Sequence, residues 1–151
     1  MMTDYTMTKG SNWWQQYNQF VKDQTLEISA WTDAGISFIN GYTGNTSDMP
    51  NTLKYRTITF GGVLIATEFA GYVKAPALTS SQGVIAICKL PSGIMKTAFT
   101  KNLSTVLLVG TGQYAVVGLD TTDFSLTINL WGLTKNLAAG TDFQVNATFE
   151  W

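Results

Sequence analysis

The stretch that most constrains the fold is residues 53–69, LKYRTITFGGVLIATEF. Two runs rich in β-branched and aromatic residues stand on either side of Gly61-Gly62. A two-glycine link can take the positive φ angles that a tight hairpin turn requires, so the sequence predicts a β-hairpin here. Residues that lie opposite each other in a hairpin share a face. An unbroken ladder predicts the facing pairs Phe60 with Val63, Ile58 with Ile65, and Arg56 with Thr67.

The rest of the chain repeats this strand-and-turn pattern. Further strands are expected at 25–31, 36–39, 84–90, 103–109, 114–119, 124–130 and 143–151. Eight or nine short strands joined by turns, with no second helical pattern, predict an all-β fold: an antiparallel β-sandwich or jelly roll. We expect Trp31 in its core. The last strand ends on an aromatic residue, Trp151, which predicts that it is pinned inside a sheet or a subunit interface.

One short helix is predicted before the strands, over residues 12–24. Asn12 is a suitable N-cap, and the aromatic and apolar residues recur at spacings of three and four: Trp13, Trp14, Tyr17, Phe20 and Val21. A helix of this length needs a packing partner. That partner is either its own domain or a copy of the chain or a neighbouring subunit. The predicted division is an N-terminal helical segment at 1–28 and a β-sandwich at 29–151.

Composition excludes several classes of function. The chain has 151 residues, enough for one domain with a sizeable core. Charged residues make up only 13%, the net charge is −1, and the nine basic residues are scattered, so neither nucleic-acid binding nor an anionic membrane surface is favoured. No apolar run is long enough for membrane insertion, and no signal peptide is expected. Cys88 is alone in an apolar run, which predicts a buried thiol.

The residues offer little for catalysis. The sequence has no His, which removes His-based acid–base chemistry and most zinc sites. No phosphate-cradling loop is present, so no cofactor and no metal are predicted. Glycoside cleavage needs only two carboxylates, and Asp120 and Asp123 are close enough in sequence to consider. They flank a DTTD turn, where Asp is favoured simply as a turn residue. No catalytic residue, and hence no enzyme, is predicted.

The sequence offers more residues suited to ligand binding than to catalysis. Proteins bind sugars with aromatic faces that stack on C–H patches and with amides, carboxylates and hydroxyls that read the ring hydroxyls. Trp131 and Asn136 lie in a loop after a finished strand, Tyr114 opens a strand, and Tyr42 and Asp48 lie in a loop rich in Asn and Thr. These five are the candidate saccharide-binding residues. The alternative for each aromatic residue is that it anchors its loop to the core.

From about Trp31 to Trp151 the chain resembles the C-terminal receptor-binding head domain of phage tail-fibre and baseplate receptor-binding proteins. The resemblance depends on the order and spacing of four features: Trp31 followed by Asn40-Gly41-Tyr42, the strand Tyr55-Arg56-Thr57-Ile58 with its hairpin, Leu90-Pro91-Ser92-Gly93, and the segment VVGLDTTDFSLTINL. The chain departs from the pattern at Ile94-Met95-Lys96, where the family has aromatic-Arg-Pro. The loops also differ, so no binding residue carries over.

The resemblance implies a phage receptor-binding protein, a homotrimer of β-sandwich heads that binds a saccharide of the host cell wall. Its other partners would be baseplate or tail proteins, and its location the tip or baseplate of the virion tail. The N-terminal helix would be a trimeric stem or a plug into the baseplate. Two alternatives stay open: a structural virion component, such as a baseplate connector or decoration protein, that binds no sugar, and a glycan depolymerase.

Overall fold

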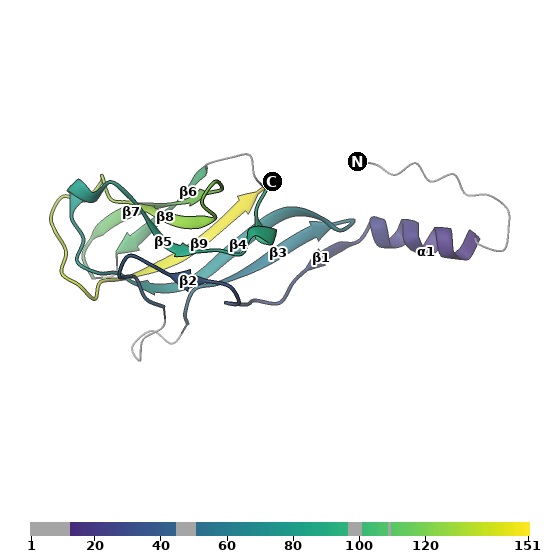
Figure 1. Ribbon diagram of the computed structural model, residues 1–151, viewed down its shortest axis with the longest axis horizontal. Coiled ribbons are helices and arrows are strands. Elements are labelled where there is room, and N and C mark those ends of the chain that lie inside the picture. Colours follow the sequence, from purple (N-terminus) through teal and green to yellow (C-terminus); the bar gives the residue numbers. More distant parts are fainter. Residues whose placement is uncertain (1–12, 45–50, 97–100, 109) are drawn as a thin grey trace.

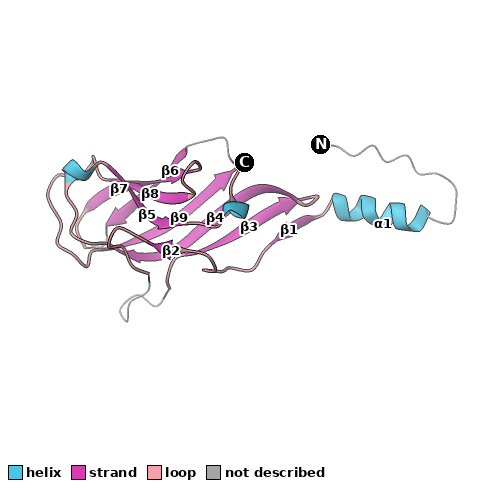
Figure 2. Ribbon diagram, in the orientation of Figure 1, coloured by secondary structure: helices cyan, strands magenta, loops and turns pink. Residues whose placement is uncertain are grey.

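The computed structural model describes residues 13–44, 51–96, 101–108 and 110–151. Within these residues the chain forms one α-helix and nine strands (Figure 1), and the strands make up the body of the molecule (Figure 2). In chain order the elements are α1 (Trp13–Asp23), β1 (Leu26–Ile28), β2 (Ser37–Phe38), β3 (Lys54–Phe60), β4 (Val63–Lys74), the 3-10 helix η1 (Ser80–Gln82), β5 (Val84–Lys89), the 3-10 helix η2 (Ser92–Ile94), β6 (Lys101–Leu108), β7 (Gln113–Asp120), β8 (Ser125–Asn129) and β9 (Asp142–Glu150).

The strands form two layers joined at one corner. They are hydrogen-bonded in the order β1-β3-β4-β9-β6-β7-β8-β5-β2, and each pairing of neighbours is antiparallel. At the β9–β6 junction, the described residues form one pair, Phe143 with Leu108. Phe69 and Phe149 from one side of this junction share a buried core with Val117 and Ile128 from the other. The predicted antiparallel β-sandwich is therefore confirmed, with a four-stranded layer (β1, β3, β4, β9) and a five-stranded layer (β6, β7, β8, β5, β2).

The last strand is pinned within the sheet, as the sequence predicts, because β9 lies between β4 and β6 in the strand order. Residues of β9 alternate between the buried core and the exposed outer face, and β9 pairs with β4 along its whole length. This pairing carries β4 on to Lys74, beyond the stretch 53–69 in which the sequence predicted the hairpin. Trp151 continues the attachment: its backbone N–H donates to the Ile65 carbonyl at 2.8 Å, and its indole N–H donates to Thr67 Oγ1 at 3.1 Å.

The central hairpin is present, but its predicted register is only partly right. Gly61 and Gly62 have φ angles of 57° and 76°, which suits a type I′ turn, and Phe60 faces Val63. A β-bulge then shifts the ladder by one residue: Ile58 faces Ala66 rather than Ile65, and Arg56 faces Glu68 rather than Thr67. The two predicted pairs are wrong because an unbroken ladder leaves no room for the extra residue of a bulge.

The bulge has a consequence on the outer face of the four-stranded layer. It sets Glu68 beside Arg56, and the Arg56 Nε forms an ion pair with the Glu68 carboxylate. The same guanidinium lies over the Trp31 ring, with its Cζ 4.7 Å from the ring centroid. Trp31 is 40% exposed, so the prediction that it lies in the core is wrong. The reason is register: Thr32 pairs with the core-facing Tyr55, which turns the preceding residue outward.

The apolar face predicted for the hairpin exists, but it lies outside the core. Leu26, Phe60 and Val63 form one cross-strand row, and Ile28 and Ile58 occupy the next. We call these five residues the hairpin-end patch. All except the half-buried Ile58 are exposed.

The predicted helix is confirmed as α1. Its C-terminal end is tied to the hairpin turn, because the Gly61 N–H donates to the Thr25 carbonyl at 3.1 Å. From there the helix extends away from the sandwich (Figure 1), and Tyr17 and Val21 of its apolar stripe are exposed. Among the described residues, none of the helices has the length and apolar character to span a membrane. The division of the chain at residues 28 and 29 stays a prediction.

Candidate binding site

A cleft of about 460 Å³ opens on the outer face of the five-stranded layer, between β7 and the loop that follows β8. Two of the predicted residues, Tyr114 and Trp131, line it together. Ala115 and Val117 point into the core, so the alternation of β7 turns Tyr114 outward. Tyr114 is 57% exposed and Trp131 is 72% exposed. The cleft therefore presents two aromatic side chains to solvent from two different segments of the chain.

A buried glutamine holds the loop against the strand. The Oε1 of Gln113 accepts hydrogen bonds from the Thr134 N–H at 2.7 Å, the Thr134 hydroxyl at 3.1 Å and the Lys135 N–H at 3.3 Å. Its Nε2 donates to the Lys135 carbonyl at 3.4 Å. Buried polar groups must be paired to be tolerated, and here the pairing fixes the loop. The cleft is thus formed before any ligand arrives.

Trp131 itself is positioned from two sides. Its backbone N–H donates to Asn129 Oδ1 at 3.0 Å, which sets the start of the loop. Its indole packs against Gly83, where an added Cβ would lie 2.7 Å from Nε1. Gly83 has a φ of 67° and accepts a hydrogen bond from the Leu130 N–H at 2.8 Å. A side chain at Gly83 would therefore strain the backbone and displace the indole.

The described residues that line this cleft include no acidic or basic side chain. Its polar side chains are the amides of Gln113 and Asn129 and the hydroxyls of Thr134 and Tyr114. Aromatic faces with neutral hydrogen-bonding groups suit an uncharged ligand that has both C–H surfaces and hydroxyls. Among the described residues, no three side chains of the Cys, Asp or Glu type gather as a metal site would require.

The other three predicted residues do not line the cleft. Tyr42 is only 3% exposed and packs edge-on against Phe143, with ring centroids 6.3 Å apart. Burial raises the pKa of Tyr42 to about 12. The structure thus places Tyr42 as an anchor of its loop to the core, the alternative reading of the sequence. Asn136 is exposed just beyond the cleft loop, and Asp48 lies outside the described residues.

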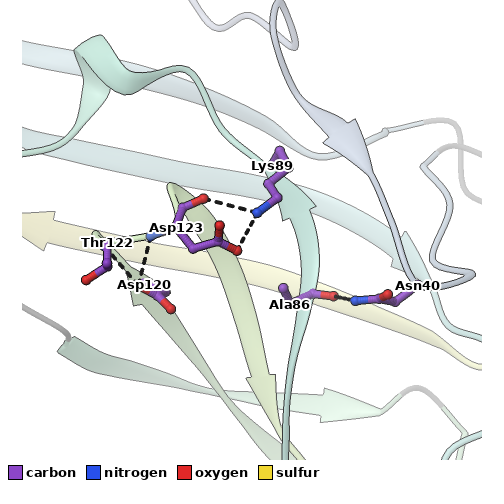
Figure 3. A network of polar contacts seen from close by, with 6 residues as sticks. All are labelled: Asn40, Ala86, Lys89, Asp120, Thr122 and Asp123. Carbon is purple, nitrogen blue, oxygen red and sulfur yellow. Dashed lines mark hydrogen bonds and ion pairs between the residues drawn. The ribbon is translucent and has the colours of Figure 1, made fainter.

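The two candidate carboxylates of the DTTD turn make structural contacts (Figure 3). Asp120 Oδ1 accepts hydrogen bonds from the backbone N–H groups of Thr122 and Asp123, at 2.9 and 3.1 Å. The Lys89 ammonium forms an ion pair with the Asp123 carboxylate and also donates to the Asp123 carbonyl at 3.2 Å. In the same view Asn40 donates to the Ala86 carbonyl at 2.9 Å. These contacts match the turn interpretation of Asp120 and Asp123.

Sequence reasoning missed Gln113, Asn129, Thr134 and Gly83. One signal was available for Gln113: it stands two residues before Ala115, at a position of β7 that faces the core. A polar residue at an inward position needs an internal partner, which the following loop supplies. Thr134 and Gly83 reach the cleft only through tertiary contacts, and no local sequence pattern indicates their role.

No protein-family model matches the sequence, and no curated protein is similar to it. Among solved structures, the fold is that of a phage receptor-binding head domain. The similar structure is the head domain of the lactococcal phage bIL170, presented as an example of a common fold for the receptor-binding domains of lactococcal phages. The match has a TM-score of 0.55 at 10% identity and covers 80% of this chain and 96% of that domain. At that identity the likeness establishes a shared fold.

Proposed function

We propose that the chain is a phage receptor-binding protein, an adhesin of the tail tip or baseplate that binds a host cell-wall saccharide as a homotrimer. The observation that carries the proposal is the cleft between Tyr114 and Trp131. Two exposed aromatic side chains and neutral amide and hydroxyl groups meet there on a loop that Gln113 holds in place. The shared fold with a phage receptor-binding head domain supports the same role. In this proposal Asn136 is a peripheral contact, and Asp48 stays a candidate.

The homotrimer is supported by apolar surface on the four-stranded layer. The hairpin-end patch and the stripe of α1 expose large apolar side chains at one end of the molecule. Contiguous apolar surface of this kind marks interaction sites in soluble proteins. We assign the partner as further copies of this chain, with baseplate or tail proteins beyond the helix. Several weak saccharide sites on one particle would then gain avidity by engaging together.

The saccharide site is tested by titrating host cell-wall saccharide while tryptophan fluorescence is recorded. We expect a saturable change for the wild type, and an affinity at least about tenfold lower for Trp131→Ala and Tyr114→Ala, because each removes a central aromatic contact. The matched control is Lys135→Ala. This side chain lies on the same loop outside the cleft, so the variant should bind like the wild type. If Trp131→Ala and Tyr114→Ala bind normally, the assignment of this cleft is wrong.

The oligomer is tested by light scattering coupled to size exclusion. We expect a stable species near three times the chain mass of 16.5 kDa. A clean monomer would contradict the trimer and leave a single-site saccharide-binding head.

A structural virion component without sugar binding remains the second candidate. The hairpin-end patch favours it as much as it favours the adhesin, because an assembly contact alone would explain this surface. Saturable saccharide binding that depends on Trp131 would exclude this alternative. A glycan depolymerase is not favoured, since Asp120 and Asp123 are engaged in turn contacts. If the wild type broke down polysaccharide and Asp120→Asn or Asp123→Asn lost this activity, the depolymerase would become the favoured function.

A further inference from the structure

A second cleft, of about 340 Å³, lies on the outer face of the four-stranded layer. Trp31 and Tyr72 contribute aromatic rings to it, and Lys54, Asn51 and Gln144 contribute polar side chains. Lys54 faces Ala70 across β3 and β4, and Tyr72 faces Gln144 across β4 and β9. Because opposed residues share a face, the small Ala70 side chain leaves a low floor between the Lys54 ammonium and the Tyr72 ring.

Trp31 is held at this cleft without being buried. The Arg56 guanidinium lies over its ring, and Glu68 holds the guanidinium through the ion pair that the bulge in β4 makes possible. The backbone next to Trp31 is fixed as well, because Thr32 and Tyr55 exchange two hydrogen bonds of 2.9 Å. An exposed indole held in this way is preorganised for contact, since little side-chain freedom is lost when a ligand stacks on it.

No described residue compensates the charge of Lys54 in this cleft. Arg56 and Glu68 neutralise each other, whereas Lys54 is exposed and makes no ion pair to any other described residue. The side-chain amides of Asn51 and Gln144 likewise have no hydrogen-bond partner among the described residues. Counted over the described residues, the cleft therefore offers one free cation and two free amides beside two aromatic rings. The cleft at Tyr114 and Trp131 has the same kind of rings but no charged lining residue.

We propose that the Trp31–Tyr72 cleft is a second saccharide-binding site, specific for a sugar unit that carries an anionic substituent. The aromatic rings stack on the C–H face of the sugar, and the Lys54 ammonium pairs with the substituent. Asn51 and Gln144 donate to and accept from the ring hydroxyls. The proposal does not depend on the Tyr114–Trp131 cleft, because the two sites lie on different layers and share no residue.

The Trp31–Tyr72 cleft and the hairpin-end patch are distinct regions of the surface. Both lie on the outer face of the four-stranded layer, but Lys54 and Ile58, the nearest member of the patch on β3, stand four residues apart. At about 3.3 Å per residue this separation is roughly 13 Å. The Arg56–Glu68 row lies between the two regions. Contacts between copies of the chain at the hairpin end therefore leave room for a ligand at Lys54.

The test uses nuclear magnetic resonance spectra of the isotope-labelled full chain, titrated separately with glucuronic acid, glucose 1-phosphate and neutral methyl glucoside. The indole N–H peak of Trp31 is assigned from its loss in Trp31→Phe. We expect this peak and the Lys54 amide peak to shift with the anionic sugars. The affinity for them should exceed that for methyl glucoside by roughly two- to fivefold, the range of an exposed ion pair. Comparison of the two anionic sugars shows whether a carboxylate or a phosphate is preferred.

Variants separate the parts of the proposal. Lys54→Gln should abolish the preference for anionic sugars while weak binding of methyl glucoside remains, and Trp31→Ala should remove the shifts at Lys54. Trp31→Phe keeps an aromatic ring and should retain binding, which guards against a folding defect in Trp31→Ala. Trp131→Ala should leave the response at Trp31 unchanged. This result separates failure of the present inference from failure of the proposed receptor site.

Three results would overturn the inference. The first is equal shifts with methyl glucoside and glucuronic acid. The second is equal shifts with sodium acetate, which would show attraction of a charge without recognition of a sugar. The third is loss of the Trp31 response in Trp131→Ala.

Discussion

The outer faces of the two layers each hold an exposed tryptophan in place, but they use different groups to do so. Each presents an exposed tryptophan in a cleft beside a tyrosine. On the five-stranded layer, the Asn129 amide and Gly83 position Trp131, and no described lining residue is charged. On the four-stranded layer, an ion pair positions Trp31, and Lys54, which no described residue neutralises, adds a positive charge beside it. The four-stranded face also carries the hairpin-end patch, so it combines a polar cleft with apolar surface.

The difference shows that an exposed aromatic residue indicates the kind of ligand only when the groups that hold the ring are considered with it. A ring held by neutral groups brings no charge into the cleft, which suits an uncharged ligand. A ring held by a neutralised Arg–Glu pair leaves a neighbouring lysine to decide the sign of the ligand. The two faces should therefore respond independently to substitution.

The largest expected effect follows from a charge placed in the hairpin-end patch. Phe60→Glu combined with Val63→Glu puts two carboxylates where we propose that copies of the chain meet, and desolvation of a buried unpaired charge is costly. Size exclusion with light scattering should show the mass fall from about three chains to one chain of 16.5 kDa. Fluorescence titration should show an unchanged intrinsic affinity in the Tyr114–Trp131 cleft.

The matched control for this double variant is Ala139→Glu, an exposed loop position outside the patch, which should leave the mass unchanged. A double variant that remains trimeric would place the contact elsewhere, with α1 as the next segment to test.

The next effect is confined to the five-stranded face. Gln113→Ala removes the acceptor of three hydrogen bonds and leaves the N–H groups of Thr134 and Lys135 without a partner. We expect a loss of about 1–3 kcal/mol in the free energy of unfolding, and about tenfold weaker saccharide binding at Trp131 as the loop loosens.

Gln113→Glu keeps an oxygen that accepts from both N–H groups and should recover part of the loss. Chemical denaturation and fluorescence titration measure the two quantities. An effect of Gln113→Ala on the Trp31 response would show that the two faces are coupled. It would contradict the expectation that they respond independently to substitution.

The smallest effect concerns the core that both layers share. Burial raises the pKa of Cys88 from 9.0 to about 12 and that of Tyr42 from 10.0 to about 12. The unfolded chain therefore loses these protons at lower pH than the folded chain. The stability that the neutral groups provide is complete below about pH 9 and is lost as the pH rises toward 12. We expect the melting temperature to fall over this range, and both clefts to be lost together.

Two variants sharpen this expectation. Cys88→Val removes one titrating group and should weaken the alkaline decline. Tyr42→Phe removes the other, and it also removes a buried hydroxyl that has no hydrogen-bond partner among the described residues. That variant should be more stable at neutral pH by about 1 kcal/mol. Thermal melts between pH 8 and 11 measure both. An alkaline decline of equal steepness in wild type and Cys88→Val would contradict the role of the thiol.

The sequence predicted the parts of the fold that local pattern controls. Alternation identified β8 and β9, and the paired glycines identified the hairpin turn. It did not predict the bulge, because nothing local distinguishes Ile65 as the extra residue, and the error passed on to Arg56 and Glu68. Trp31 was misplaced for a similar reason: its side depends on the pairing of Thr32 with Tyr55, a contact across 23 residues of chain.

The candidate site, like the fold, was predictable only where a local sequence signal marks the residue. Tyr114 and Trp131 were found because exposed aromatic residues at strand and loop ends are a local signal, and the structure brings them together. Tyr42 carried the same signal but packs on Phe143 in the core. The groups that shape the cleft, Gln113 and Gly83, act through residues that are distant in sequence. Only the assembled sandwich shows them.

The position of β9 has a consequence for how the molecule is made. This strand is the hydrogen-bonded link between β4 and β6, yet it follows every other strand in the order of synthesis. While the chain is still growing on the ribosome, β3 and β4 can pair, as can β6, β7 and β8, but the two halves have no strand between them. Phe69 and Leu108 stay uncovered until Phe143 and Phe149 arrive. Folding should therefore be slow until β9 has left the ribosome. A chaperone would have its longest opportunity to bind in that interval.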